Sequence, residues 1–434
     1  MYTCVSFGPS VVEISEGPKN HRAMKICLLC YRGKPNCGGQ GVYIYYLSRE
    51  LQNLGHEVHV ISGPPYPVVE EGITLHKLDS LLLYDRPERF PRDFPWRHPT
   101  PLNLYEYLNV CFGLFPEPYT FSMRAFRKLR QLQRIHKFDI VHDNQGLGYG
   151  MLLIKHLLKI PVVATIHHPI TVDRDTDIAT APNLRWRIRL RLWYSFLRMQ
   201  KYVARRMDRV ITVSHNSADD LVKAFGIDRN KMEVVHNGTD HNLFKPCPET
   251  VRKANSIITV NSGDSPIKGA DYLLQALTML RDGPSQPKLT IVGRIAPESR
   301  NLRLVKEYGV EDMVTFTGRI DNEELVSLYS SSEIAVVPSL YEGFGFPATE
   351  AMACGTPVIA SRAGSLPEVV GEDNEAGISV PPANAVALAE AIKRLLADDS
   401  LRKEMGLAGR RRVEDHFNWR RAAEDTIRVY EELL

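Results

Sequence analysis

Apolar and polar positions in the first half of the chain form blocks that predict short buried strands separated by helices. Five continuous, mostly apolar runs have the character of strands covered on both faces: MKICLLCY (24–31), EVHVIS (57–62), IVHDN (140–144), PVVATIHH (161–168) and RVITVS (209–214). Segments with helical periodicity lie between most of them, notably at 125–136 and 147–158. This alternation predicts a doubly wound parallel sheet.

The second half restarts the same pattern. Its predicted strands are SIITV (256–260), KLTIVG (288–293), VTFTG (314–318), IAVVPS (334–339) and PVIAS (357–361). Its predicted helices lie near 270–281, 322–331, 347–354 and 385–398, and the last segment, FNWRRAAEDTIRVYEELL, is also helical. Each half therefore predicts its own Rossmann-like domain.

The boundary between the two domains is predicted at the polar segment VVHNGTDHNLFKPCPE, which is punctuated by Gly and Pro. We expect an N-terminal domain over 24–240 and a C-terminal domain over 241–415, with the helix at 416–434 packing back on the first domain. Residues 1–23 are expected to be a disordered extension. Residues 64–123 are rich in Pro, Arg and aromatic residues, with little periodicity, and predict a long irregular insert.

Composition narrows the class of protein. A length of 434 residues suits two domains, and a net charge of +3 gives no argument for a nucleic-acid partner. Seven scattered cysteines are not a disulfide framework, which favours a reducing cytoplasm. Cys27 and Cys30 share one predicted strand and would point to opposite faces, which is wrong for a metal site. The sequence has neither an 18-residue apolar run nor a visible signal peptide.

The strongest chemical signal is SLYEGFGFPATEAMACGTP (339–357), which reads as a strand end, a tight glycine loop and a helix starting at Pro347. Backbone N–H groups of such a loop and helix N-terminus can bind a phosphate. Glu342 and Glu350 flank the loop, and carboxylates accept hydrogen bonds from hydroxyls. A ligand carrying both phosphates and hydroxyls, such as a sugar nucleotide, fits this pattern. The plain alternative is a capped helix with a solvated acid.

These motifs, taken in order, resemble a family. CGGQG after the first strand, TIHH, HNGTD, SPIKG, VTFTGRI, the paired glutamates and the terminal helix are similar to those of retaining glycosyltransferases of family 4. The resemblance covers roughly residues 24–434. It implies the GT-B fold, in which two Rossmann-like domains face an interdomain cleft.

The resemblance also implies roles in the second domain. Glu342 matches the residue that binds hydroxyls of the donor sugar, beside the loop Gly343–Phe344–Gly345. Glu350 matches the residue that holds the ribose, and Lys268 matches the cation that neutralises the diphosphate. The backbone at Gly318–Arg319 resembles the wall that receives the nucleobase. For Lys268 the alternative is an exposed lysine before a helix.

In the first domain, Gly38 and Gly39 are similar to the glycine loop that closes over the diphosphate, although a tight turn would have the same sequence. His167 matches a histidine facing the donor sugar, and its predicted position at a strand end suits the ligand crevice of an open α/β sheet. His168 is expected to be structural. In the linker turn, Asp240 is expected to fix the hinge.

One expected residue is missing. Family members commonly carry an arginine five residues before the lysine of the SPIKG-like motif, and this chain has Gly263 there. Arg294 or Arg319 is expected to substitute for that charge, or backbone N–H groups hold the phosphates.

The implied activity is a retaining hexosyl transfer from a UDP- or GDP-linked sugar to a glycan or a lipid-linked precursor. Lys268, Glu342 and His167 are its expected catalytic residues. The usual proposal for the family needs no dedicated protein base, and we expect no metal and no cofactor.

Residues 185–206, RWRIRLRLWYSFLRMQKYVARR, have helical spacing with an apolar stripe and an arginine stripe. Such a helix can lie on an anionic membrane surface. The interpretation we favour is a helix packed on the first domain's sheet with a solvated arginine face.

Several other activities fit part of the sequence. A dehydrogenase would need a full G-x-G-x-x-G, which CGGQG lacks, and an acid at the end of the second strand, which EVHVISGPP lacks. A glycoside hydrolase would not need the glycine loop or Lys268. A sugar-nucleotide epimerase, a phosphorylase on the same scaffold, and a non-catalytic sugar-nucleotide-binding protein stay open as alternatives.

Overall fold

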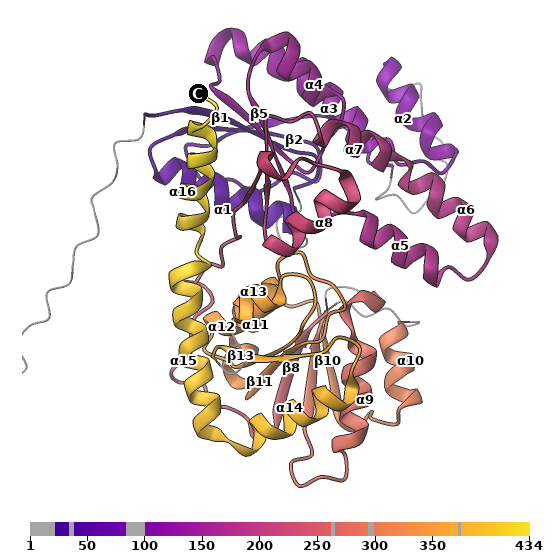
Figure 1. Cartoon of the computed structure of the whole chain (residues 1–434), viewed down its shortest axis with the longest axis vertical. Coiled ribbons are helices and arrows are strands. Elements are labelled where there is room, and N and C mark those ends of the chain that lie inside the picture. The colour runs from indigo at the N-terminus through magenta and orange to yellow at the C-terminus, as the bar shows by residue number, and fades with distance from the viewer. Residues whose placement is uncertain (1–21, 34–38, 84–99, 262–264, 294–298, 372–374) are drawn as a thin grey trace, which may run out of the picture.

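The computed structural model describes residues 22–33, 39–83, 100–261, 265–293, 299–371 and 375–434. Within them the chain forms two domains, each built on one parallel sheet with helices on both faces (Figure 1). The predicted α/β fold class with two doubly wound domains is confirmed.

The N-terminal sheet has the strand order β3-β2-β1-β4-β5-β6-β7. Its strands are β1 (Lys25–Cys30), β2 (Glu57–Ser62), β3 (Thr74–Lys77), β4 (Ile140–Asn144), β5 (Val162–Ile166), β6 (Arg209–Thr212) and β7 (Met232–Val234). Its helices are α1 (Gly39–Asn53), α2 (Pro101–Cys111), α3 (Glu117–His136), α4 (Gly150–Leu153), η1 (Ile154–Leu158), α5 (Thr171–Thr180), α6 (Leu184–Trp193), η2 (Tyr194–Phe196), α7 (Leu197–Ala204), α8 (His215–Phe225) and η3 (Arg229–Lys231).

The C-terminal sheet has the order β10-β9-β8-β11-β12-β13. Its strands are β8 (Ser256–Val260), β9 (Lys288–Val292), β10 (Val314–Gly318), β11 (Ile334–Val337), β12 (Val358–Ser361) and β13 (Gly377–Val380). Its helices are η4 (Pro266–Lys268), α9 (Ala270–Leu280), α10 (Arg300–Glu307), α11 (Asn322–Ser331), α12 (Phe346–Ala353), α13 (Leu366–Val370) and α14 (Ala385–Ala397). In each sheet the strand order reverses at one point, between β1 and β4 in the first and between β8 and β11 in the second. Open α/β folds bind ligands at such switch points.

The last two helices connect the domains. Helix α15 (Asp399–His416) packs on α12 of the second domain, and α16 (Trp419–Glu431) crosses to pack on α1 of the first (Figure 1). Tyr430 of α16 is buried, and its hydroxyl lies 2.5 Å from His142 Nδ1 on β4. The end of the chain is therefore part of the first domain's core.

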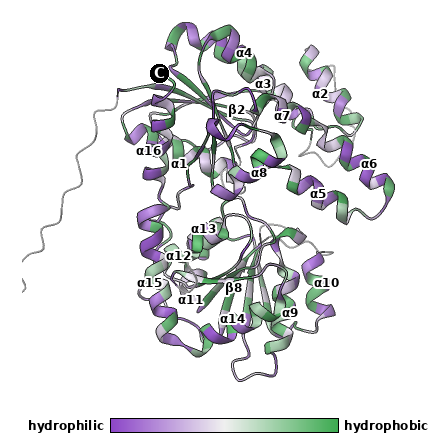
Figure 2. Ribbon diagram, viewed as in Figure 1, coloured by the Kyte–Doolittle hydropathy of each residue, from purple (hydrophilic) through white to green (hydrophobic). Residues whose placement is uncertain are grey.

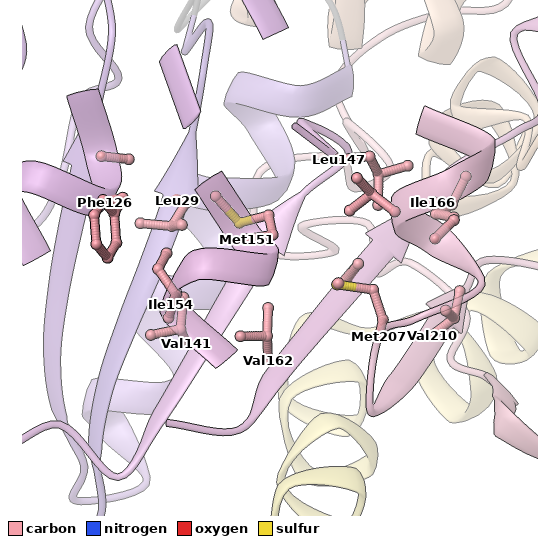
Figure 3. Packing of buried hydrophobic residues seen from close by; sticks show 14 of the residues in the cluster. Leu29, Phe126, Val141, Leu147, Met151, Ile154, Val162, Ile166, Met207 and Val210 are labelled. Atoms are coloured by element: carbon pink, nitrogen blue, oxygen red, sulfur yellow. The ribbon is translucent and has the colours of Figure 1, made fainter. Parts of the chain in front are cut away.

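Apolar side chains fill both faces of each sheet. On one face of the N-terminal sheet, Leu29, Val141, Val162 and Val210 from four strands meet side chains of α3, α4 and η1 (Figure 3). Cys27 belongs to this cluster, whereas Cys30 belongs to the cluster on the other face, and both are buried. None of the described helices is long and apolar enough to cross a membrane.

The prediction of an irregular insert over 64–123 is wrong for much of its described part. Strand β3, helix α2 and the first turns of α3 lie there. The signals are local: Pro101 begins α2, and the Thr100 side chain accepts a hydrogen bond from the Asn103 N–H at 3.1 Å. Residues 84–99 of this segment lie outside the described residues.

The preferred interpretation of 185–206 as one helix packed on the sheet is also wrong for its first half. The helix changes to a 3₁₀ turn at η2, and only α7 buries an apolar face, through Leu197, Met199 and Val203. Helix α6 has no buried residue and packs on α5 rather than on the sheet. Figure 2 shows its hydrophilic and hydrophobic residues interspersed along the ribbon. Helical spacing of apolar residues predicts an apolar face on a helix. That face is buried only where another element packs on it.

Candidate functional site

Two charged side chains meet at the switch point of the C-terminal sheet. Lys268 ends η4, in the connection that follows β8, and Glu342 lies in the loop after β11. Lys268 Nζ donates to Glu342 Oε1 at 2.6 Å, and Ser339 Oγ donates to the same oxygen at 2.9 Å. The side chains are 24% and 11% exposed, so the pair is shielded from water but open to a ligand.

Backbone packing holds these two loops together. The Leu340 N–H donates to the Ile267 carbonyl at 2.7 Å, which ties the β11 loop to η4. Gly269, directly after Lys268, has a φ of +68°, and a Cβ at this position would overlap the carbonyl of Pro338. The glycine of SPIKG therefore allows Lys268 to come close to the acidic loop.

The predicted glycine loop continues from Glu342 into α12. Gly345 has a φ of +100° at the position before the helix. The Ser365 N–H and Oγ donate to the carbonyls of Glu342 and Phe344, at 3.0 and 2.5 Å. Phe344 is buried and its ring lies 5.8 Å from that of Phe417. The buried Phe344 ring thus anchors the loop in the core of the second domain and fixes its backbone.

Glu350 lies on α12, one turn from the loop. It accepts a hydrogen bond from the Tyr329 hydroxyl at 3.3 Å. Burial among apolar neighbours raises the pKa of Glu350 to about 7, and the Tyr329 hydrogen bond offsets part of this rise. A carboxyl group with a pKa near 7 is partly ionised at neutral pH. In its ionised form it can accept hydrogen bonds from a pair of hydroxyls.

The N-terminal domain contributes neutral polar groups. His167 directly follows β5, and its Nε2 lies 2.8 Å from Asn144 Oδ1 at the end of β4. Asn144 Nδ2 donates to the Gln40 carbonyl at 3.1 Å, so its Oδ1 must face His167 and Nε2 must carry the proton. Burial lowers the pKa of His167 to about 3. The imidazole is therefore neutral, with Nδ1 as its acceptor atom.

The two domains touch through the glycine loop. A Cβ on Gly343 would lie 2.7 Å from the His167 carbonyl, so only glycine fits between them. The Gly343 carbonyl accepts hydrogen bonds from Ser214 Oγ at 3.1 Å and Ser217 Oγ at 3.3 Å. A Cβ on Gly39 would lie 3.8 Å from the Phe346 ring, so the start of α1 also faces the loop. The structure thus brings His167, Gly39 and the Glu342–Gly345 loop to one interdomain junction.

A second interdomain contact could not be found from the sequence. Glu368 Oε1 and Oε2 accept hydrogen bonds from the N–H groups of Asn216 and His215, at 2.8 and 2.9 Å, at the N-terminus of α8. Burial acts to raise the pKa of Glu368, but the hydrogen bond from His236 and those from the two N–H groups outweigh it and lower the pKa. Tyr341 adds a hydrogen bond to Asp220 at 3.1 Å. The sequence around Glu368 and Asp220 has no motif that distinguishes these acids from solvent-exposed ones.

Of the other residues named from the sequence, some are described and some lie outside the described residues. Gly318 ends β10, the edge strand two positions from β8, and Arg319 beside it is exposed. Asp240 accepts hydrogen bonds from the N–H groups of Asn242 and Leu243 at 3.1 and 3.2 Å. His168 pairs with Asp173 at 2.7 Å. Gly38, Gly263 and Arg294 lie outside the described residues.

Two family models match the chain. Glycosyltransferase Family 4 matches residues 37–243, and Glycosyl transferases group 1 matches residues 248–412. Each model covers one of the two domains, and together they span both halves of the site.

Curated relatives extend over nearly the whole chain. An MMP alpha-(1->4)-mannosyltransferase of Mycolicibacterium hassiacum is 44% identical over 95% of this chain and 98% of its own. A D-inositol 3-phosphate glycosyltransferase of Streptomyces bingchenggensis is 27% identical over 93% of this chain and 86% of its own.

A solved sucrose-phosphate synthase from Thermosynechococcus elongatus has the same two-domain arrangement. It superposes with a TM-score of 0.70 at 25% identity, over 94% of this chain and 99% of its own. The family models, the 44% identical relative and the two facing parallel-sheet domains agree. This chain belongs to the group 1 glycosyltransferases, with an N-terminal domain of the family 4 type and the GT-B fold.

Proposed function

We propose that this enzyme is a retaining, metal-independent mannosyltransferase that moves an α-mannosyl group from a nucleotide-diphosphate mannose to a hydroxyl of a saccharide. The observation that carries the proposal is the ion pair of Lys268 and Glu342, 2.6 Å apart at the switch point of the C-terminal sheet. The choice of mannose rests on the 44% identical mannosyltransferase. Of the UDP- and GDP-linked donors, we propose the GDP-linked one.

Lys268 supplies the charge that the leaving group needs. When the bond between the sugar's anomeric carbon and the diphosphate breaks, its electron pair stays on a phosphate oxygen. A fixed cation at that oxygen stabilises the transition state. The donor would replace part of the contact between Lys268 and Glu342, which leaves the Glu342 carboxylate free to bind sugar hydroxyls. A protein cation in this position makes a metal ion unnecessary for charge neutralisation.

The N-terminal domain is proposed to position the donor sugar while the acceptor attacks it. The acceptor hydroxyl attacks the anomeric carbon from the side that the diphosphate leaves, and its proton passes to the departing phosphate oxygen. The configuration is retained and no protein base is consumed. His167 is neutral, with Nε2–H held by Asn144, so it can position a sugar hydroxyl but adds no charge to an oxocarbenium-like centre.

Helix α6 is proposed to guide a lipid-linked or otherwise amphipathic acceptor. Its Trp186, Ile188 and Leu192 are 46%, 50% and 45% exposed beside four arginines. Apolar and cationic side chains, the two kinds that contact anionic membrane surfaces, are therefore both accessible, although they alternate around the helix. Cosedimentation with vesicles containing an anionic phospholipid tests this part, and Trp186→Ala is expected to weaken it. Equal binding to neutral and anionic vesicles would argue against it.

The transfer itself is tested with purified protein and a short α-linked mannoside as acceptor. GDP-mannose, UDP-glucose and UDP-N-acetylglucosamine are compared as donors in excess EDTA, and the anomeric configuration of the product is read by NMR. An α-linked mannoside from GDP-mannose, lost in Glu342→Gln, is the expected result.

Each part of the proposal has its own contrary result. A product formed only from a UDP-sugar would refute the mannosyl donor, and a β-linked product would refute retention. Activity that EDTA abolishes and Mg²⁺ restores would refute metal independence. Donor conversion to another sugar nucleotide without acceptor would identify an epimerase instead.

A further inference from the structure

A cluster of metal-ligand side chains lies far from the junction of the two domains. Glu57 and His59 are two residues apart on β2 and therefore project from the same face of the N-terminal sheet. His136 is the last residue of α3 and reaches the same point. Glu57 Oε1 lies 3.1 Å from His59 Nε2 and 3.7 Å from His136 Nδ1, and the three atoms are all within 4.8 Å of one another.

These separations suit a small divalent cation. Zinc binds His nitrogens and carboxylate oxygens at about 2.0–2.2 Å in a tetrahedron, in which two ligand atoms are roughly 3.3 Å apart. The two distances measured from Glu57 Oε1 lie on either side of this value. The carboxylate of Glu57 is 44% exposed and the ring of His136 28%, so both can adjust and a cation can enter from solvent. A fourth position remains for water.

The three atoms that meet here would repel one another without a proton or a cation between them. A carboxylate oxygen and two imidazole nitrogens are all acceptors unless a nitrogen carries a proton. In the metal-free chain a proton on His59 Nε2 satisfies the contact with Glu57. When a divalent cation takes this place, the neutral His59 ring changes tautomer and its proton lies on Nδ1.

A second layer of side chains orients the ligands. His59 Nδ1 lies 2.9 Å from Nε2 of His76 on β3, and the two rings stack 5.2 Å apart. If His59 donates this hydrogen bond, its Nε2 lone pair faces the cluster, which is the arrangement found around bound zinc. Lys25 Nζ holds the other oxygen of Glu57 at 3.2 Å and leaves Oε1 for the histidines. Phe138 closes one side, 5.0 Å from the His59 ring.

The position within the fold indicates what such an ion does. Glu57 begins β2, so the cluster lies at the end of the sheet opposite to the strand ends that carry His167 and Asn144. It joins β2 to the point where α3 ends and the left-handed Lys137 turns the chain toward β4. We propose that Glu57, His59 and His136 bind a zinc-like divalent cation that clips the end of α3 to the sheet, with His76 as a positioning residue. This inference does not depend on the proposed mannosyl transfer.

The test uses the full chain without a histidine tag, stripped with chelator and titrated with ZnCl₂ in a calorimeter. We expect about one equivalent to bind, with a rise in melting temperature. Co²⁺ in the same site should give the visible absorption of a tetrahedral complex. His136→Ala and Glu57→Gln should each weaken Zn²⁺ binding by more than about tenfold.

His156→Ala is the matched control, because His156 is an exposed histidine of the same domain outside the cluster. Its Zn²⁺ affinity should equal that of the unchanged chain. Both cluster variants have partly exposed side chains, and equal melting temperatures without metal will show that they fold. No binding, or equal binding in the two variants and the control, would overturn the proposal. Mg²⁺ at the same concentration should neither bind nor compete, and a Mg²⁺ affinity equal to that for Zn²⁺ would also overturn it.

Discussion

The two halves of the site have the same topology but differ in charge: one carries an ion pair and the other carries neutral polar groups. In the second domain the switch point between β8 and β11 carries a cation and an anion, Lys268 and Glu342, 2.6 Å apart. In the first domain the switch point between β1 and β4 has Asn144 beside it, and His167 follows the next strand. These groups are neutral and held by hydrogen bonds. The fold therefore fixes where a ligand binds, and the side chains decide what each half does to it.

This difference in charge predicts different roles for the two halves in a glycosyl transfer. Charge develops on the leaving diphosphate, so the half with Lys268 is expected to control the chemical step. The neutral half lies against the glycine loop and is expected to set position and to exclude water. Mutations can test that division because loss of transition-state charge stabilisation and loss of positioning differ in their kinetic signatures.

The largest effect is expected from removing the cation. Lys268→Ala should lower kcat by roughly 10²–10³, because the developing charge on the diphosphate loses its fixed counter-ion and Glu342 keeps only the Ser339 hydrogen bond. Steady-state kinetics with GDP-mannose and a mannoside acceptor measure this. Lys288→Ala on β9 is the control, since Lys288 contacts the Asp312 carbonyl away from the junction. A change in KM alone would mean that Lys268 binds the donor without assisting departure.

A smaller effect is expected from separating the halves. In Gly343→Ala the new methyl group would lie 2.7 Å from the His167 carbonyl, so the closed arrangement must open. We expect kcat/KM to fall by about ten- to a hundredfold, as for a displacement of about 1 Å between reacting groups. Small-angle scattering should show a more open chain.

The control for this variant is Gly283→Ala, whose Cβ would lie 3.3 Å from the Leu280 carbonyl in a loop of the second domain. It should retain full activity. If Gly343→Ala also retains it with an unchanged scattering profile, the closed junction is not needed for transfer.

The sequence predicted the second half of the site better than the first. Lys268, Glu342 and Glu350 lie in two short segments with Gly and Pro at positions that local geometry requires, so spacing alone relates them. His167 was found at its strand end, but its partners Asn144 and Gln145 come from another strand more than 20 residues away. Such pairings are set by strand order, which a single sequence does not specify.

The fold shows a similar limit. Continuous apolar runs and helical periodicity predict most strands and helices, but not β3, β7 and β13, whose sequences TLHK, MEV and GISV form no continuous apolar run. Helix α6 was expected on the sheet because its apolar positions have helical spacing. It packs mainly on α5 and has no buried residue, since periodicity identifies a helix but not the surface that covers it. Glu368 was missed because an acid that caps a helix of the other domain has no local signature.

The smallest effect is a pH dependence that distinguishes the halves. We propose that Glu350 binds the ribose hydroxyls of the donor. Its pKa is raised to about 7, so its ionised fraction, and with it the binding of these hydroxyls, should increase about tenfold between about pH 6 and pH 8. His167 has a pKa of about 3 and stays neutral throughout. Donor affinity measured by calorimetry should therefore rise with pH in the unchanged chain and be flat and weaker in Glu350→Gln.

Stability gives an independent check on the same group, with the opposite sign. The pKa of Glu350 is higher in the folded chain than the ordinary value of 4.5, so the folded state binds more protons and loses stability as pH rises from 4.5 to about 7. The melting temperature of Glu350→Gln should exceed that of the unchanged chain above pH 7, and this difference should shrink as pH falls toward 4.5. If donor affinity rises with pH in both proteins, a group other than Glu350 titrates.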